Sequence, residues 1–174
     1  HSFTTATAWG DTGGSVKNCA SSDGLVSGAT TLEQSNSVDR ALSIRQTGSF
    51  GDPGAAFELE LTSTAGFENF SLSFQNQMLS VQGRSTIWTI QYSIVADGNV
   101  WSTLGTYTDP GSFGSTPFSI TMPANFSNVA NTVYIRVIAF SAATGSGSRD
   151  TYGIDDFSLT YTAIVPTCTP PTLQ

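Results

Sequence analysis

The chain has few charged residues and very few basic ones. Only 11% of its 174 residues are charged, with 6 Lys and Arg against 13 Asp and Glu, and the formal net charge is -7 at pH 7. Proteins that bind nucleic acid need clustered Lys and Arg to neutralise phosphates. The composition therefore argues against nucleic acid as a partner.

Histidine is almost absent, since His1 is the only one. A serine triad or a histidine general base therefore cannot be built into the fold. Paired carboxylates could hydrolyse a glycosidic bond. However, Glu58 and Glu60 alternate with apolar residues from Phe57 to Leu61, which is typical of a solvated sheet face. A lyase mechanism based on Tyr and Arg stays open, but no spacing supports it, and we predict a protein that is not an enzyme.

Only two cysteines are present, Cys19 and Cys168, and neither has the spacing of a zinc or redox site. The ends of a β-sandwich often lie close together, so the two could form a disulfide. On the chain-entropy model such a bridge would stabilise the fold by about 4–5 kcal/mol. Alternatively, Cys168 belongs to the next module of a longer protein.

No apolar run is long enough to cross a bilayer, and no signal peptide is recognisable. We therefore predict no membrane insertion and expect a mature or excised segment of a secreted or cell-surface protein. Pro166, Pro170 and Pro171 would interrupt any strand near the C-terminus. We predict a domain over residues 1–163 and a Pro/Thr-rich linker over 164–174, with neighbouring domains of the same chain as partners.

Short runs of alternating apolar and polar residues fill most of the chain, separated by Gly, Pro, Asp and Asn. This pattern predicts an all-β fold, a two-sheet antiparallel β-sandwich of the jelly-roll type. Asp97-Gly98 is the clearest hairpin signal, because this pair tolerates the positive φ angles of a tight turn. The predicted strands are 41–46, 55–62, 70–75, 86–95, 101–107, 116–121, 132–140 and 153–161.

Two adjacent acids, Asp155 and Asp156, interrupt the last predicted strand. Strand alternation places Asp155 on the same face as Phe157 and Leu159, at the edge of the core. A carboxylate there needs hydrogen bonds or a cation such as calcium, unless it only caps a loop. The acids that could join it come from the loop-rich N-terminal region. They are Asp11, Asp23, Glu33 and Asp39. Of these four we select Asp11 and Glu33, so the predicted metal ligands are Asp155, Asp11 and Glu33.

Sugars bind to exposed aromatic faces flanked by hydrogen-bonding groups. The stripe of Trp88, Ile90 and Tyr92 has strand periodicity and is predicted to be core. Trp9 and Tyr152 fall outside such a stripe and are predicted to be freer to contact a ligand. Trp101, directly after the Asp97-Gly98 turn, is expected to pack over its hairpin.

Polar side chains on the opposite strand faces are the other candidate ligand contacts. If their strands adjoin in one sheet, they form a groove for a neutral glycan or for one with sulfate or carboxylate groups, which Arg binds bidentately. The alternative is an ordinary solvated face. The long segment 141–152 adds loop-borne candidates, among which Arg149 and Asp150 could instead form a surface ion pair. The predicted ligand-binding residues are Arg45, Gln75, Gln91, Arg136, Arg149, Asp150, Tyr152 and Trp9.

Several motifs occur in a familiar order: Asp97-Gly98-Asn99-Val100-Trp101, Leu104-Gly105, Val133-Tyr134-Ile135-Arg136-Val137 and Gly153-Ile154-Asp155-Asp156-Phe157-Ser158-Leu159. Together they resemble the jelly-roll accessory domains of secreted bacterial multidomain proteins, many of which are similar to carbohydrate-binding modules. The resemblance implies a structural calcium ion on Asp155. It also implies a non-catalytic module that binds polysaccharide and targets a larger protein to it. A structural or adhesive spacer is the alternative, and a polysaccharide lyase or hydrolase domain is the third possibility.

Overall fold

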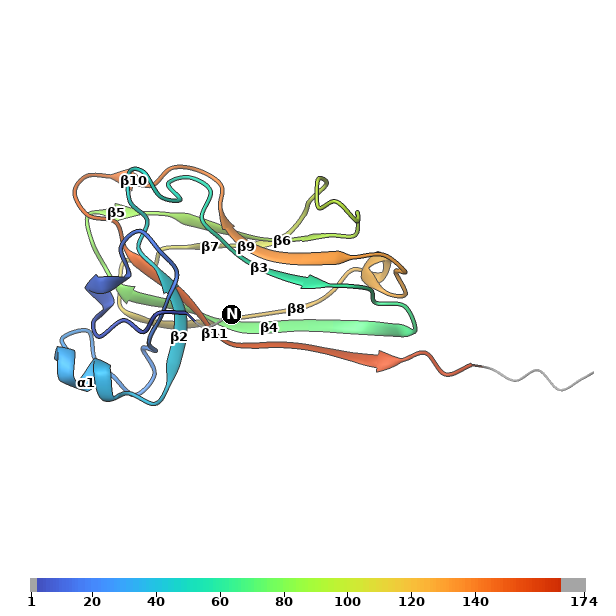
Figure 1. Ribbon diagram of the computed structural model, residues 1–174, viewed down its shortest axis with the longest axis horizontal. Coiled ribbons are helices and arrows are strands. Elements are labelled where there is room, and N and C mark those ends of the chain that lie inside the picture. The colour runs from blue at the N-terminus through green and yellow to red at the C-terminus, as the bar shows by residue number, and fades with distance from the viewer. Residues whose placement is uncertain (1–2, 167–174) are drawn as a thin grey trace, which may run out of the picture.

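Two antiparallel sheets packed face to face make up the computed structural model, which describes residues 3–166 (Figure 1). One sheet has the strand order β1 (Lys17–Ala20), β2 (Arg40–Ile44), β11 (Thr151–Ala163), β4 (Phe67–Ser80), β8 (Gly114–Thr121). The other has the order β3 (Ala56–Leu61), β9 (Val133–Ala139), β6 (Ile87–Ser93), β7 (Ser102–Thr108). The predicted two-sheet jelly-roll sandwich is confirmed.

The strands form where the sequence alternates. In β9, for example, Val133, Ile135 and Val137 are buried while Tyr134 and Arg136 face outward. The same alternation identified all eight predicted strands, which correspond to every strand above except β1.

The elements that the alternation did not predict are short. A two-stranded ladder joins β5 (Arg84–Ser85) to β10 (Thr144–Gly145). Helix α1 (Thr31–Asn36) begins at a capping box of Thr30 and Glu33, and two 3-10 turns, η1 (Trp9–Thr12) and η2 (Ala124–Phe126), complete the fold. None of the helices in residues 3–166 could cross a membrane.

The core between the sheets is aromatic. Trp88, Ile90 and Tyr92 are buried, as predicted. The ring of Trp88 stacks on Tyr152, with centroids 4.3 Å apart, and so links the four-stranded sheet to the five-stranded one. The Tyr152 hydroxyl donates to Asn76 Oδ1 at 2.7 Å, which satisfies both polar groups inside the core.

A second, smaller core lies outside the five-stranded sheet. There Trp9, Cys19 and Leu79 pack together, and the Trp9 indole N–H donates to the Ala20 carbonyl at 2.9 Å. In Figure 1 these N-terminal elements, drawn in blue, gather at the left end of the sandwich. They cover part of the outer face of the five-stranded sheet.

The turn between β6 and β7 is the hairpin predicted from Asp97-Gly98. The Gly98 N–H donates to the Val95 carbonyl at 2.8 Å, and Gly98 has a φ of +64°, which favours glycine. The Asn99 N–H donates to Asp97 Oδ1 at 3.1 Å and fixes the turn from its other side. This hairpin directs the following residue, Trp101, back over the sheet.

We expect Ile90→Ala to lower the free energy of unfolding by about 2–5 kcal/mol, because the fully buried side chain would leave a cavity between the sheets. Denaturant unfolding followed by tryptophan fluorescence measures this. Thr89→Ala, on the outward face of the same strand, is the control and should cost less than about 1 kcal/mol. Equal losses in the two variants would contradict the assignment of the faces.

Candidate functional site

A row of polar side chains crosses the outer face of the four-stranded sheet. Strand register places Glu58 opposite Arg136, Arg136 opposite Gln91 and Gln91 opposite Thr103. Arg136 donates from Nε and from a terminal nitrogen to Gln91 Oε1, at 3.0 and 2.8 Å, and Gln91 Nε2 donates to Thr103 Oγ1 at 3.3 Å. The row is thus a connected hydrogen-bond network on the outer face of the sheet, in which Gln91 itself is only 4% exposed.

Trp101 lies over the centre of this row. The Arg136 guanidinium is 3.6 Å from the centroid of its ring, a close cation–π contact. Tyr134 flanks the ring, with centroids 6.2 Å apart, and donates its hydroxyl to the Ala96 carbonyl at 3.0 Å. Trp101 remains partly exposed. The prediction that it packs over its own hairpin is therefore correct only in part, because it also reaches across the sheet to Arg136.

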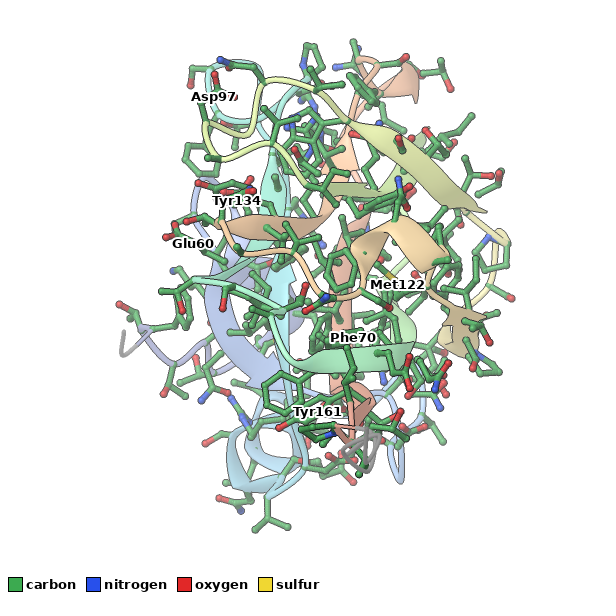
Figure 2. The ribbon with its side chains drawn as sticks, turned by 90° about the vertical axis from the view of Figure 1, so that its right-hand side faces the viewer. Glu60, Phe70, Asp97, Met122, Tyr134 and Tyr161 are labelled. Atoms are coloured by element: carbon green, nitrogen blue, oxygen red, sulfur yellow. The ribbon has the colours of Figure 1, made fainter. Side chains whose placement is uncertain are left out.

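Acidic side chains surround this network. In Figure 2, Asp97, Tyr134 and Glu60 lie along one side of the molecule. Burial, and then the charges of Glu60, Glu58 and Asp97, raise the pKa of Tyr134. Burial lowers the pKa of Arg136, and the charge of Glu58 partly offsets this effect. Arg136, the one cation of the row, is already engaged by Gln91 and Trp101. The charge left on the surrounding surface is therefore that of the nearby acids. We call the surface formed by Glu58, Glu60, Gln91, Trp101, Thr103, Tyr134 and Arg136 the Trp101 face.

Two of the four predicted groove residues meet on the Trp101 face, namely Gln91 and Arg136. Gln75 lies on β4 in the other sheet, opposite Asp155 and Pro117. Arg45 follows β2 in that same sheet and donates to Thr151 Oγ1 and Ser80 Oγ, at 2.9 and 2.8 Å. The strands that carry these four residues are therefore divided between the two sheets, and the predicted four-residue groove does not form.

The candidates expected to be accessible in loops are largely buried. Trp9 is 5% and Tyr152 1% exposed, because Trp9 fills the second core and Tyr152 lies on β11, which the structure extends to Thr151. The expectation that they are free to contact a ligand is corrected. Arg149 forms an ion pair with Asp52 and not with Asp150, which is itself buried.

A cavity of about 450 Å³ has a different character. Phe57, Leu59, Ile154 and Phe157 contribute apolar walls, and Glu58 and Arg136 of the Trp101 face lie at its lining as well. Sugar hydroxyls need hydrogen-bond donors and acceptors. The polar groups that could bond sugar hydroxyls are therefore concentrated on the Trp101 face, whereas the walls of this cavity are mainly apolar.

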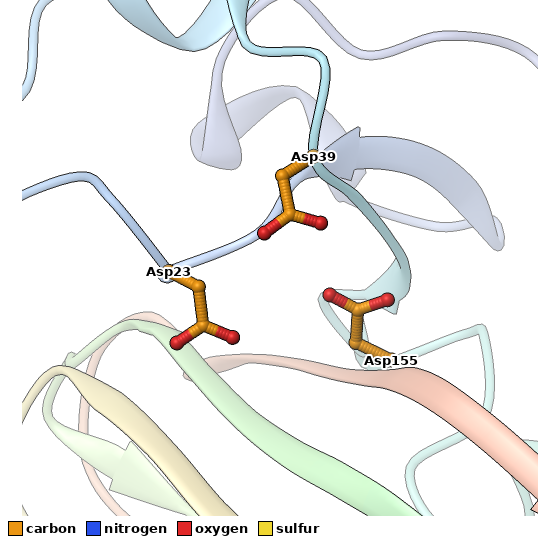
Figure 3. A group of neighbouring side chains, drawn as sticks. All are labelled: Asp23, Asp39 and Asp155. Carbon is orange, nitrogen blue, oxygen red and sulfur yellow. The ribbon is translucent and has the colours of Figure 1, made fainter.

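Three carboxylates meet on the other sheet. Asp155 of β11, Asp23 of the loop after β1 and Asp39 just before β2 each offer an oxygen, and these oxygens all lie within 4.8 Å of one another (Figure 3). The pairing of β1 with β2 brings the two loops together, with the Ser21 N–H donating to the Asp39 carbonyl at 3.1 Å. Asp23 is further held by the Ser115 hydroxyl at 2.9 Å.

A β-bulge turns Asp155 toward this cluster. Asp155 is opposite Gln75 and Ser158 opposite Ser73, so one extra residue is inserted between them, and Asp156 has a φ of +50°. Strict alternation placed Asp155 on the face of Phe157 and Leu159, and this is wrong. Ile154, just before the bulge, is buried, and so Asp155 faces outward, while Leu159 packs on the core after it.

The other two predicted metal ligands lie elsewhere because their carboxylates cap helices. Asp11 accepts hydrogen bonds from the Thr7 hydroxyl and the Ala8 N–H, at 2.8 and 3.0 Å. Glu33 accepts from the Thr30 N–H and hydroxyl, at 2.6 and 2.7 Å, which lowers its pKa. Asp23 and Asp39, which sequence reasoning considered but did not select, take their place beside Asp155. The pairing of β1 with β2 positions them, and β1 was not predicted because its four residues do not alternate between apolar and polar.

The three carboxylates carry like charges in close contact. Burial raises the pKa of Asp155, and the charges of Asp39 and Asp156 raise it further, while hydrogen bonds from the Asp156 N–H and Ser21 oppose the rise. Asp155 Oδ2 is buried without a hydrogen-bond partner among residues 3–166. Oxygen ligands of this type could hold a hard metal ion, which would offset the repulsion.

Cys19 lies on β1, opposite Ala41 of β2, and is buried. Its thiol contacts the Ser43 hydroxyl, and burial raises its pKa to about 11. Cys168 lies outside the described residues, so the predicted disulfide stays a prediction. Most of the predicted linker over residues 164–174 also lies outside the described residues, which end three residues after β11, at residue 166. The linker therefore stays a prediction.

Neither a protein-family model nor a curated protein matches this chain. A CBM4 carbohydrate-binding module matches with a TM-score of 0.47 and 15% identity, over 71% of this chain and 72% of that one. A CBM61 module solved in complex with β-1,4-galactotriose matches with a TM-score of 0.45 and 16% identity, over 84% and 82%. A CBM28 module described as specific for non-crystalline cellulose matches with a TM-score of 0.42 and 16% identity, over 73% and 77%.

Proposed function

We propose that the Trp101 face binds a neutral polysaccharide and that the domain tethers a secreted or cell-surface protein to it. The observation that carries the proposal is the Trp101 ring, held over the sheet by Arg136 at 3.6 Å and still partly exposed. A fixed aromatic ring offers its free side to the apolar face of a sugar. Thr103 and the glutamates beside it supply a hydroxyl and acceptors for the sugar hydroxyls, while Gln91, which is 4% exposed, holds Arg136 in place.

The charge of the face favours a neutral glycan. Arg136 is engaged on its Nε edge by Gln91 and on its plane by Trp101, so this edge is not free to bind a sulfate or a carboxylate bidentately. Glu58, Glu60 and Asp97 would repel an anionic chain. The Glu58 and Glu60 side chains point to the same side of a single strand and do not face each other across a cleft, which supports binding without cleavage.

We further propose that a calcium ion bound by Asp23, Asp39 and Asp155 has a structural role. The three acids come from β11 and from two N-terminal loops that pack on it. An ion here would fasten those loops to the five-stranded sheet. It would lie on the opposite sheet from the Trp101 face, and so it would not bridge to the sugar.

Trp101→Ala is expected to weaken binding to a retained neutral polysaccharide at least tenfold, because the stacking surface is lost. Affinity electrophoresis on a panel of neutral polysaccharides measures this. Trp101→Phe should keep a ring on the sheet and most of the affinity. The control is Tyr161→Ala, which removes another exposed aromatic ring, on β11 (Figure 2). Wild-type affinity in Trp101→Ala would refute the proposed platform.

Polysaccharide charge should decide retention. We expect the domain to be retained by at least one neutral polymer and by no sulfated or uronate polymer, with little change between low and high salt. The same panel run at two salt concentrations gives the answer. Strong, salt-sensitive retention on an anionic polymer would contradict the assignment of Arg136, and no retention on any polymer would favour the spacer.

Asp155→Asn should have opposite effects with and without calcium. In chelator the variant should melt above wild type, because it removes a carboxylate that the fold disfavours. With calcium at about 100 times its dissociation constant, wild type should gain about 2.7 kcal/mol and the variant should gain less. Differential scanning fluorimetry follows both. Asp156→Asn, at the neighbouring exposed position, should respond to calcium like wild type, and loss of the response there as well would count against Asp155 as the ligand.

A further inference from the structure

The two sheets do not end together along one side of the sandwich. β3 is the edge strand of the four-stranded sheet and packs against β11, where the ring centroids of Phe57 and Tyr152 are 6.1 Å apart. The five-stranded sheet continues beyond β11 to β2 and β1. Among residues 3–166 no strand follows β3 in its own sheet, so the inward side of β2 lacks the cover that β3 gives to β11.

The incompletely covered strip is apolar. Leu42 of β2 and Val16, just before β1, pack against the core but are only half-buried. Phe3 and Phe157 are 43% and 39% exposed. These four side chains line the cavity of about 450 Å³ together with Leu59 of β3. Apolar side chains that gather at an exposed hollow are typical of a surface that binds a partner.

The backbone of β3 is open on the same side. The Ala139 N–H donates to the Ala55 carbonyl at 2.9 Å. Hydrogen-bonded and non-hydrogen-bonded pairs alternate in an antiparallel ladder, so every second residue from Ala55 onward turns its backbone groups toward β9. The residues between them direct their N–H and C=O groups to the free edge, and these residues are Ala56, Glu58 and Glu60. An extended chain could pair with this edge. We call the free edge of β3 and the adjoining cavity the β3 groove.

The charge of the edge decides which chain fits. The side chains of Glu58 and Glu60 are exposed, and neither forms an ion pair within the described part of the chain. Antiparallel pairing with β3 of a second copy would bring these glutamates against each other, and like charges directly opposite destabilise a sheet. A strand that carries Lys or Arg at the corresponding positions would instead pair with them. The chain's net charge of -7 also favours a basic partner.

We propose that the β3 groove docks an extended peptide segment of another protein, in which basic and apolar residues alternate. The segment extends the four-stranded sheet beyond β3, and its backbone pairs with Ala56, Glu58 and Glu60. Its apolar side chains enter the cavity over Leu42 and Phe157. Its basic side chains lie on the outer face beside the two glutamates. The site adjoins the Trp101 face but does not depend on glycan binding.

Two capped hexapeptides, which alternate lysine with valine or with phenylalanine, are the probes for this site. The matched control peptides carry glutamate in place of lysine. In a titration of the 15N-labelled domain, a lysine peptide should shift the backbone amide signals of Ala56, Glu58 and Glu60 saturably, and the glutamate peptides should not. If neither lysine peptide shifts these signals, or if the glutamate peptides bind equally well, the proposal is overturned.

Charge reversal tests the specificity of the edge. The double variant Glu58→Lys/Glu60→Lys should bind the lysine peptide about tenfold more weakly and gain binding of the glutamate peptide. Trp101→Ala should bind the lysine peptide like wild type, which separates this site from the proposed glycan site. Wild-type affinity for the lysine peptide in the double variant would contradict the role of the glutamates.

Backbone pairing is tested at Ala56. Ala56→Pro removes an N–H of the free edge and leaves the ladder with β9 intact, so it should abolish peptide binding, whereas Ala56→Ser should not. Thermal melting checks that each variant folds. Sedimentation velocity should show a monomer at all concentrations. A dimer that forms with concentration and is lost in Ala56→Pro would show that a second copy occupies the edge and would overturn the proposal, as would unchanged peptide binding in a folded Ala56→Pro.

Discussion

The stacking of Trp88 on Tyr152 is the contact on which the arrangement of this protein depends. It joins a strand of the four-stranded sheet to the last strand of the five-stranded one, in the middle of an aromatic core. Once the inward faces are fixed in this way, strand alternation decides what faces solvent. Gln91 and Arg136 are turned outward because Ile90, Tyr92, Ile135 and Val137 are turned inward. The candidate glycan surface is therefore a consequence of how the core packs.

The Trp101 face combines groups of opposite character. The hairpin places an aromatic ring over a guanidinium, and the ring and Gln91 together satisfy that cation within the protein. What remains for a ligand is a ring face, the Thr103 hydroxyl and the acids, because the Gln91 amide is buried and bonded to Arg136 and Thr103. This combination suits a chain of neutral sugars better than an anionic one.

Sequence reasoning found the elements that alternate and missed those that depend on tertiary contacts. The strands, the hairpin and the core stripe follow from local pattern, and they were predicted. The acid cluster required knowledge of the bulge at Asp156, which reverses the face of Asp155, and of the pairing of β1 with β2, which carries Asp39 into place. Asp11 and Glu33 are acids of the same kind, but capping of a helix start uses their oxygens locally. Trp9 and Tyr152 were misjudged because burial by a distant segment leaves no local pattern.

The most direct test of the central claim is the location of the bound sugar. Backbone and side-chain chemical shifts of the 15N-labelled domain, recorded during titration with neutral cello-, manno- and galacto-oligosaccharides, would give it. We predict that the largest changes fall on the Trp101 indole N–H, on Gln91 and on Thr103, with the five-stranded sheet unaffected. Changes confined to the five-stranded sheet or to the N-terminal loops, with Trp101 unmoved, would contradict the account.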